Sequence, residues 1–147
     1  MNPGEDGARQ DARGKPIPLD EPHMRPYWEA ARRREFVIQH CDVCRLWIHP
    51  PRFACPRCQT ESLGWKQPSG AGQIYAFSVM YMAGVPGYPE TPYAVAVVEL
   101  DEQPGLITVG NVLGSEPSAL RVGDRVQVDF EDIGEGWVLP QWRRAGA

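Results

Sequence analysis

The sequence predicts a mainly β protein in which a short N-terminal helix and a cysteine-rich ribbon precede a small closed barrel. Glycine and proline contribute 15 residues each to a chain of 147 residues, well above the average of roughly 12% for the pair, which favours turns over long helices. All four cysteines fall in two Cys-x-x-Cys pairs. About five alternating apolar segments follow Gly70, too few for a two-sheet sandwich but enough for a barrel with Greek-key connections.

Three regions are expected along the chain: a flexible arm over residues 1–17, a helix and ribbon over residues 18–66, and the barrel over residues 67–147. The arm mixes glycine, proline and both charge signs without hydrophobic periodicity, and such a composition does not bury a core. A helix of about two turns is expected from Pro26, because proline suits the first helical position and apolar side chains then recur on one helical face.

The strands are predicted from the alternation of apolar and polar residues between turns rich in glycine and proline. In the ribbon they are expected at Phe36–His40, Leu46–His49 and Glu61–Lys66. In the barrel they are expected at Gly72–Met82, Tyr93–Leu100, Leu106–Leu113, Arg125–Glu131 and Trp137–Trp142.

Two of the barrel strands carry more detailed expectations. Strict alternation in the first strand would place four bulky side chains on one face, namely Tyr75, Phe77, Val79 and Tyr81. The nearly all-apolar Tyr93–Leu100 is expected to be buried on both faces. Between these strands, Ala83–Pro92 contains three prolines and two glycines and is expected to form a loop.

The four cysteines have the spacing of a tetrahedral metal site. Cys41 and Cys44 form one pair, and Cys55 and Cys58 form the other after ten intervening residues. Two residues between cysteines let both sulfurs face one ion, so a hairpin that joins the pairs completes a four-thiolate site for structural zinc, with iron as the alternative. Four protein ligands leave no open coordination position for chemistry. A redox dithiol would need a βαβ context and disulfides an exported chain, and neither signal is present.

No second group of residues suggests catalysis. Nucleophilic catalysis needs an activated side chain beside a base, but the cysteines are assigned to the metal and the only lysines are Lys15 and Lys66. His40 and His49 flank the cysteine pairs and are expected to be strand residues rather than ligands. The chain is therefore expected not to be an enzyme.

Charge and hydropathy exclude two further classes of protein. Residues 67–147 carry four basic and ten acidic side chains, whereas a surface that follows a phosphate backbone is basic. No window approaches 18 consecutive apolar residues, and the N-terminus has no apolar segment of a secretory signal. We therefore expect a cytoplasmic protein that binds neither nucleic acid nor a membrane.

Five segments taken together resemble one known family. In chain order they are PYWEAARRREFVIQHC, CDVCRLWIHPPRFACPRC, a Gly-x-Ile-Tyr-x-Phe-x-Val strand, PYAVAVVEL and LRVGDRVQVDFED. Their combination, from Pro18 to Trp142, is similar to the acyl-CoA-associated family in which an N-terminal rubredoxin-like zinc ribbon precedes an OB-fold. The resemblance implies that the barrel is a small OB-fold Greek-key barrel.

Members of that family are accessory subunits, or appended domains, of thiolase-superfamily enzymes that handle acyl-coenzyme A. They serve thiolases, acyltransferases and the retro-aldolases of steroid side-chain breakdown. The resemblance therefore implies a non-catalytic subunit of steroid or lipid metabolism, in a hetero-oligomer with such an enzyme. Some members carry a fused hydratase domain, for which this chain has no segment, so we expect the catalytic partner to be a separate polypeptide.

Two surfaces are candidates for contacts with other molecules. The ribbon segment is the most basic region, and its cations could meet the phosphates of coenzyme A or simply be solvated: Arg45, Arg52, Arg57 and Lys66. Candidate residues for a partner interface are Val85, Tyr88, Tyr75 and Phe77. Tyr75, Phe77 and Tyr81 also support an alternative, single-stranded nucleic-acid binding, because OB-folds stack bases on aromatic side chains.

Overall fold

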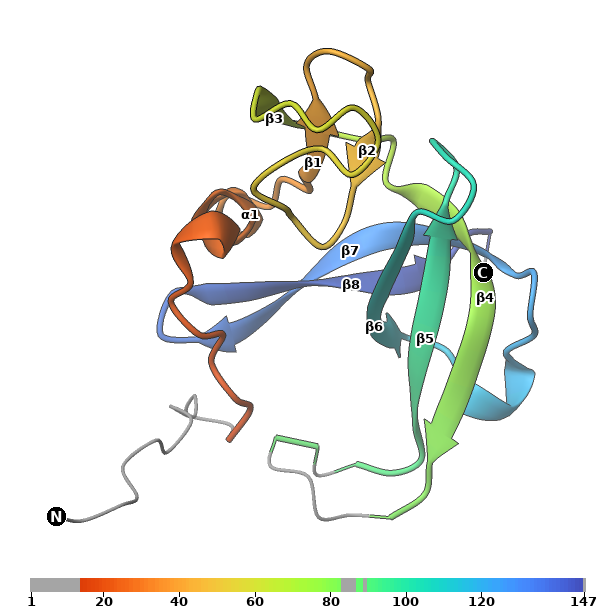
Figure 1. Cartoon of the computed structure of the whole chain (residues 1–147). Helices are drawn as coiled ribbons and strands as arrows, with labels where there is room; N and C mark the ends of the chain where they lie inside the picture. Colours follow the sequence, from red (N-terminus) through yellow and green to blue (C-terminus); the bar gives the residue numbers. More distant parts are fainter. Residues whose placement is uncertain (1–13, 83–86, 89, 147) are drawn as a thin grey trace, which may run out of the picture.

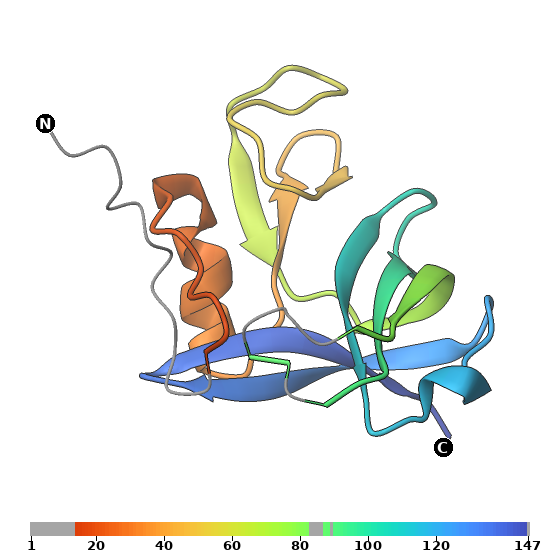
Figure 2. The same ribbon diagram turned by 90° about the horizontal axis from the view of Figure 1, so that it is seen from below.

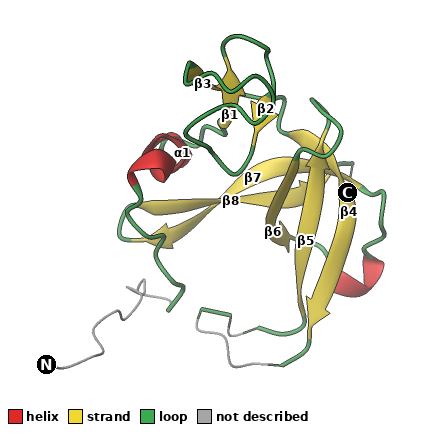
Figure 3. Cartoon of the chain, in the orientation of Figure 1, coloured by secondary structure: helices red, strands yellow, loops and turns green. Residues whose placement is uncertain are grey.

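The computed structural model describes residues 14–82, 87–88 and 90–146. A short helix, a three-stranded ribbon and a closed five-stranded barrel follow one another along the chain (Figure 1 and Figure 3). The mainly β class predicted from the sequence is therefore confirmed.

The helical region begins with a 3₁₀ turn, η1 (Pro22–Met24), which leads directly into α1 (Arg25–Arg32). Pro26 lies in the first turn of α1, where its missing N–H costs no helical hydrogen bond. Ala30 and Ala31 are the buried residues of α1. α1 has eight residues, and none of the helices in the described part of the chain is long and apolar enough to cross a bilayer.

The ribbon is an antiparallel sheet in which β1 (Ile38–Cys41) lies between β2 (Trp47–Ile48) and β3 (Leu63–Lys66). All four residues of β1 are buried, with Ile38 in the core cluster shared with the barrel and Cys41 in the cluster within the ribbon. The strand ends at Cys41, so the sheet positions the first cysteine of the predicted metal site.

The barrel contains β4 (Ala71–Met80), β5 (Tyr93–Leu100), β6 (Ile107–Leu113), β7 (Arg125–Gly134) and β8 (Trp137–Arg144), with a 3₁₀ turn, η2 (Pro117–Ala119), before β7. The strands close in the order β4-β5-β6-β8-β7. Only β6 and β8 run parallel, and they pair through Val112 with Trp142 and Leu113 with Arg143. Figure 2 shows β7 and β8 as a long ribbon that extends past the barrel toward α1.

A β-bulge in β4 exchanges the two faces of this strand. Ile74 pairs with Val98 and Ala76 with Val97, so Tyr75 is the extra residue. Ile74 is buried before the bulge, and Phe77 packs against the core after it, but Tyr75 is 61% exposed. The prediction that Tyr75 and Phe77 share a face is therefore wrong, because one inserted residue shifts the alternation of all that follow.

The side chains of β5 alternate between buried and half-buried. The buried positions are Ala94, Ala96, Val98 and Leu100. The prediction of burial on both faces is wrong, because a barrel encloses only the inward face of each strand. The outward face of β5, which carries Val95 and Val97, keeps partial access to solvent.

The end of the predicted flexible arm is anchored on the protein. Ile17 is 7% exposed. Lys15 Nζ lies 2.5 Å from Glu131 Oε1 of β7, and both side chains are largely buried. The arm therefore does not extend as far as residue 17, since one apolar side chain and one ion pair fix its last residues; residues 1–13 lie outside the described part of the chain.

One hydrophobic core joins the helix–ribbon region to the barrel. Phe36, just before β1, packs edge-on against Trp142 of β8 with 5.9 Å between the ring centroids. Ile38 of the ribbon belongs to the same buried cluster as Ile74 and Leu100 of the barrel. A second, smaller cluster around Cys41, Ile48 and Cys55 forms within the ribbon.

Candidate metal centre and docking surface

The four cysteine sulfurs lie together at the end of the ribbon. Each sulfur lies within 4.8 Å of the other three. Cys41 Sγ and Cys58 Sγ are 3.6 Å apart, and Cys44 Sγ and Cys55 Sγ are 3.5 Å apart. A tetrahedral ion with metal–sulfur distances of about 2.3 Å requires sulfur–sulfur distances of about 3.8 Å. The four side chains therefore fit a four-thiolate metal.

Two backbone turns of the same shape hold the sulfurs in place. In the first turn, the N–H of Arg45 donates to the carbonyl oxygen of Cys41 at 3.0 Å, and Arg45 has φ 61°. In the second turn, the N–H of Gln59 donates to the carbonyl oxygen of Cys55 at 2.9 Å, and Gln59 has φ 63°. The residue after each Cys-x-x-Cys pair therefore adopts the left-handed conformation that turns the chain back toward the sheet.

The thiols differ in how readily they ionise. Burial opposes ionisation of Cys55, but the N–H groups of Cys58 and Arg57 and the neighbouring thiols lower its pKa to about 6. The N–H of Leu46 favours the Cys44 thiolate, yet burial and the neighbouring sulfurs raise the pKa of Cys44 to about 11. Four thiolates this close repel one another, so a cation is needed for all four to be deprotonated together.

The two histidines beside the cysteines lie outside this cluster; His40 is in β1 as predicted, whereas His49 follows β2 and is not a strand residue. His40 is 5% exposed and its ring lies 4.8 Å from the ring of Trp47. The ring of His49 lies 5.8 Å from that of Tyr27. Burial lowers the pKa of both imidazoles, and nearby Lys66 lowers that of His40 further. Among the described residues, only the four cysteines group as metal ligands.

The basic residues of the ribbon are exposed and come from different segments of it. Arg45 and Lys66 lie near the buried His40, whose pKa both of them lower. Arg52 and Arg57 belong to the segment between β2 and β3. All four side chains are exposed, and none has an ion-pair partner within the described ranges. They present positive charge at exposed positions of the ribbon.

The three predicted interface residues that the structure describes differ in their exposure. Tyr75 is exposed at the bulge of β4, whereas Phe77 is half-buried against the core. Tyr88 is half-buried and stacks on Tyr93 with 4.3 Å between ring centroids. Val85 lies outside the described residues. Of the three that the structure describes, Tyr75 is therefore the most accessible.

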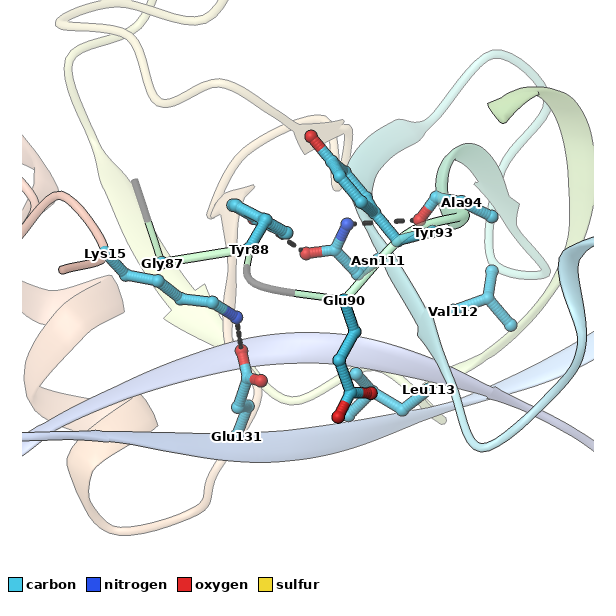
Figure 4. A pocket seen from close by; sticks show the side chains of 10 residues that line it. All are labelled: Lys15, Gly87, Tyr88, Glu90, Tyr93, Ala94, Asn111, Val112, Leu113 and Glu131. Carbon is cyan, nitrogen blue, oxygen red and sulfur yellow. Dashed lines mark hydrogen bonds and ion pairs between the residues drawn. The ribbon is translucent and has the colours of Figure 1, made fainter. Parts of the chain in front are cut away.

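A cavity of about 560 Å³, which no sequence pattern indicated, is lined by residues of β5, β6 and β7 and of the segment before β5 (Figure 4). Its apolar lining comes from Ala94, Val112 and Leu113. Within it, the Tyr88 hydroxyl donates to Asn111 Oδ1 at 2.9 Å, and Asn111 Nδ2 donates to the carbonyl oxygen of Ala94 at 3.1 Å.

A buried polar network continues from this cavity into the barrel wall. Gln141 Nε2 donates to Asn111 Oδ1 at 3.2 Å, and Gln141 Oε1 accepts the backbone N–H of Asn111 at 2.6 Å. Gln141 also reaches Glu131, the partner of Lys15, at 3.3 Å. The sequence signal for this network was the presence of the amide residues Asn111 and Gln141 in otherwise apolar strand segments, because a buried amide needs hydrogen-bond partners.

The fold and the site define a class: a rubredoxin-like ribbon with four cysteines, followed by an OB-fold barrel. Comparison with known proteins agrees. Residues 28–64 match the rubredoxin-like zinc ribbon domain of ChsH2, and residues 65–131 match the C-terminal OB-fold domain of ChsH2. The chain belongs to the DUF35 family, to which the ChsH2 domains belong.

A similar solved structure is described as the Ltp2-ChsH2(DUF35) aldolase. It has 33% identity and a TM-score of 0.81, and the match covers 87% of this chain and 98% of that one. A probable enoyl-CoA hydratase alpha subunit of Thermomonospora curvata is 35% identical over 81% of this chain, which spans only 36% of that protein. A DUF35 domain-containing scaffold protein of Methanocaldococcus jannaschii is 28% identical over 74% of this chain and 77% of that protein.

Proposed function

We propose that this chain is a non-catalytic accessory subunit that binds a separate acyl-CoA enzyme of the thiolase superfamily in a cytoplasmic hetero-oligomer. The observation that carries the proposal is the similarity, at 33% identity and a TM-score of 0.81, to the DUF35 chain of the Ltp2-ChsH2 aldolase. The relative described as a scaffold protein supports the same role.

The described side chains support a binding role better than a catalytic one. The four sulfurs gather in one cluster, which fits a saturated structural zinc site with no open position. Lys15 is paired with Glu131 and largely buried, whereas Lys66 is exposed at the end of β3. Lys15 is held in an ion pair rather than left as a free amine, and Lys66 has no desolvated pocket around it among the described residues.

The alternative function, single-stranded nucleic-acid binding, has less support. Its proposed stacking residues do not form one platform, because the bulge at Tyr75 turns that ring away from half-buried Phe77. The barrel region carries four basic and ten acidic side chains, which would repel a phosphate backbone. Binding to single-stranded DNA at physiological salt should therefore be no tighter than the non-specific range of about 10⁻⁴–10⁻⁶ M.

The basic ribbon surface extends the proposal to coenzyme A. Arg45 and Lys66 are exposed near His40 and could meet a phosphate at the edge of a partner's active site. In this arrangement the partner enzyme carries out the reaction, and this chain adds positive charge beside the bound cofactor.

Co-expression with a thiolase-superfamily acyl-CoA enzyme of the same organism tests the proposal. The two polypeptides should co-purify at a fixed ratio, and acyl-CoA turnover should appear only when the enzyme is present. The purified metal-loaded chain should be inactive when assayed alone. Turnover by this chain alone, or failure to co-purify with any thiolase-superfamily enzyme, would show the proposal to be wrong.

A further inference from the structure

Two adjoining cavities form a groove between α1 and the outward face of the barrel. The smaller, of about 270 Å³, lies between Tyr27 and Trp28 of α1, Val95 and Val109 of β5 and β6, and Leu139 of β8. The larger is the cavity of Figure 4, and both are lined by Tyr88 and Asn111. We name the surface formed by the two cavities the α1–β6 groove; Trp28 lies at one end of it and Glu90 at the other.

The walls of the α1–β6 groove are fixed in place. Trp28 packs edge-on against Tyr27 at 4.9 Å and against Trp137 at 6.3 Å between ring centroids. On the far side of the smaller cavity, the hydrogen bond between Tyr88 and Asn111 holds the boundary between the two cavities. A groove with fixed walls binds a partner with little loss of side-chain entropy.

Exposed apolar side chains continue from the groove across the sheet. Val109 is 64% exposed and lies opposite Val97, which in turn lies opposite Ala76. Tyr75, next to Ala76, is 61% exposed. This apolar row crosses β6, β5 and β4. A small ligand bound within the two cavities would leave most of the row uncovered. Exposed apolar surface of this width is typical of protein contacts.

The larger cavity makes one end of the groove acidic. Glu90 and Glu131 both line it, together with a single cation, Lys15. Lys15 is already paired with Glu131 at 2.5 Å, whereas Glu90 is exposed and has no ion-pair partner in the part of the chain that the structure describes. The excess carboxylate favours a cation from outside the chain.

We propose that the α1–β6 groove receives a short segment of the partner enzyme, with apolar side chains against Trp28, Val95 and Val109 and a lysine or arginine beside Glu90. This inference rests on the proposed function, because it names the surface of this chain that the enzyme uses. Of the candidate interface residues, Tyr88 lines the groove and Tyr75 lies in the apolar row beside it.

Two substitutions and two matched controls test the groove in the co-expressed complex. Val109→Asp puts a charge in the apolar row, and Glu90→Lys reverses the charge at the acidic end. Val122→Asp is the first control, since Val122 is 67% exposed on the turn before β7. Glu116→Lys is the second, since Glu116 is exposed beside η2 and its side chain caps no helix.

Titration of each variant against the purified enzyme subunit measures its binding affinity. Val109→Asp should weaken binding by at least about tenfold. Glu90→Lys should weaken binding by about threefold to tenfold, mainly through slower association, and should reduce its dependence on salt. Both control variants should bind within about twofold of the wild type. Circular dichroism and thermal unfolding check that each variant is folded.

Three outcomes would overturn the proposal, and they separate it from the proposed function. If the wild-type chain binds the enzyme and both groove variants bind it equally well, the groove is not the docking surface, and the accessory role is left intact. A wild-type chain that binds no acyl-CoA enzyme would overturn both. Self-association of this chain that Val109→Asp abolishes would assign the groove to a second copy instead.

Discussion

Gln103, in the turn between β5 and β6 of the barrel, binds both backbone groups of Trp47 in the ribbon. Gln103 Oε1 accepts the Trp47 N–H at 2.9 Å, and Gln103 Nε2 donates to the Trp47 carbonyl oxygen at 3.0 Å. The amide therefore occupies the place of a neighbouring strand along the free edge of β2, and it ties the four-cysteine ribbon to the barrel.

Replacing Gln103 with alanine should lower the free energy of unfolding by about 1–2 kcal/mol, because both backbone groups of Trp47 lose their partner. Urea denaturation followed by tryptophan fluorescence measures the change. Gln73→Ala is the control: Gln73 is exposed on β4 and makes one side-chain bond, to Glu99 at 3.3 Å, so its loss should cost under about 0.5 kcal/mol. Equal losses in the two variants would argue against the link.

The four-cysteine cluster should bind one metal ion per chain, and that ion should stabilise the ribbon. Cys55→Ser or treatment with a strong chelator should remove most of the metal and disorder the ribbon, since metal affinity is folding free energy in so small a region. Elemental analysis of the purified chain measures stoichiometry and separates zinc from iron. A folded sample with well under one zinc or iron ion per chain would contradict this prediction.

Replacing Tyr88 with phenylalanine should cost about 0.5–1.5 kcal/mol of unfolding free energy. The hydroxyl donates to Asn111 Oδ1, which would keep only the bond from Gln141. Thermal unfolding of Tyr88→Phe and of Tyr75→Phe compares the two positions. No side-chain hydrogen bond of Tyr75 is found among the described residues, so Tyr75→Phe should unfold like the wild type, and an equal shift in both variants would count against the network.

Acid should weaken the pairing of β7 with β8 through Asp129. The side chain of Arg143, at 2.7 Å, and the backbone N–H of Phe130 lower the pKa of Asp129 below its usual 3.8. Because the folded-state pKa is depressed, the contribution to stability is present above about pH 4 and is lost as the pH falls through the folded-state value.

Asp129→Asn should therefore flatten the decline of unfolding free energy below about pH 4. The effect should be under about 1 kcal/mol, because the Asp129 and Arg143 side chains are 37% and 52% exposed. Denaturation at a series of acidic pH values, with Asp132→Asn as the control, measures the slope. If unfolding free energy falls with pH at the same rate in the wild type and in Asp129→Asn, the ion pair does not contribute to acid unfolding.

Local spacing was enough to predict several parts of this protein. The two Cys-x-x-Cys pairs predicted the sulfur cluster, because two residues between cysteines fix where both sulfurs point within one turn. Pro26 and the apolar residues after it placed the start of α1 within one residue. The alternating segments placed all five barrel strands, although β7 and β8 continue beyond the predicted ends.

Features that depend on pairing between distant strands could not be predicted in this way. The bulge at Tyr75 is visible only in the register of β4 against β5, and it moved Phe77 to the opposite face. Lys15 and Glu131 are 116 positions apart in the chain, yet their ion pair anchors the end of the predicted arm. Asn111 and Gln141 are 30 positions apart and share one network.

The sequence alone determined the class of fold, the four metal-binding cysteines and the acidic character of the barrel. These properties follow from composition and from contacts between residues a few positions apart, which hold in any arrangement of the remaining chain. Only the tertiary structure decided which aromatic residues are exposed, how the ribbon joins the barrel and where the α1–β6 groove lies. Those properties depend on strand register and barrel closure, which bring together side chains that no local pattern relates.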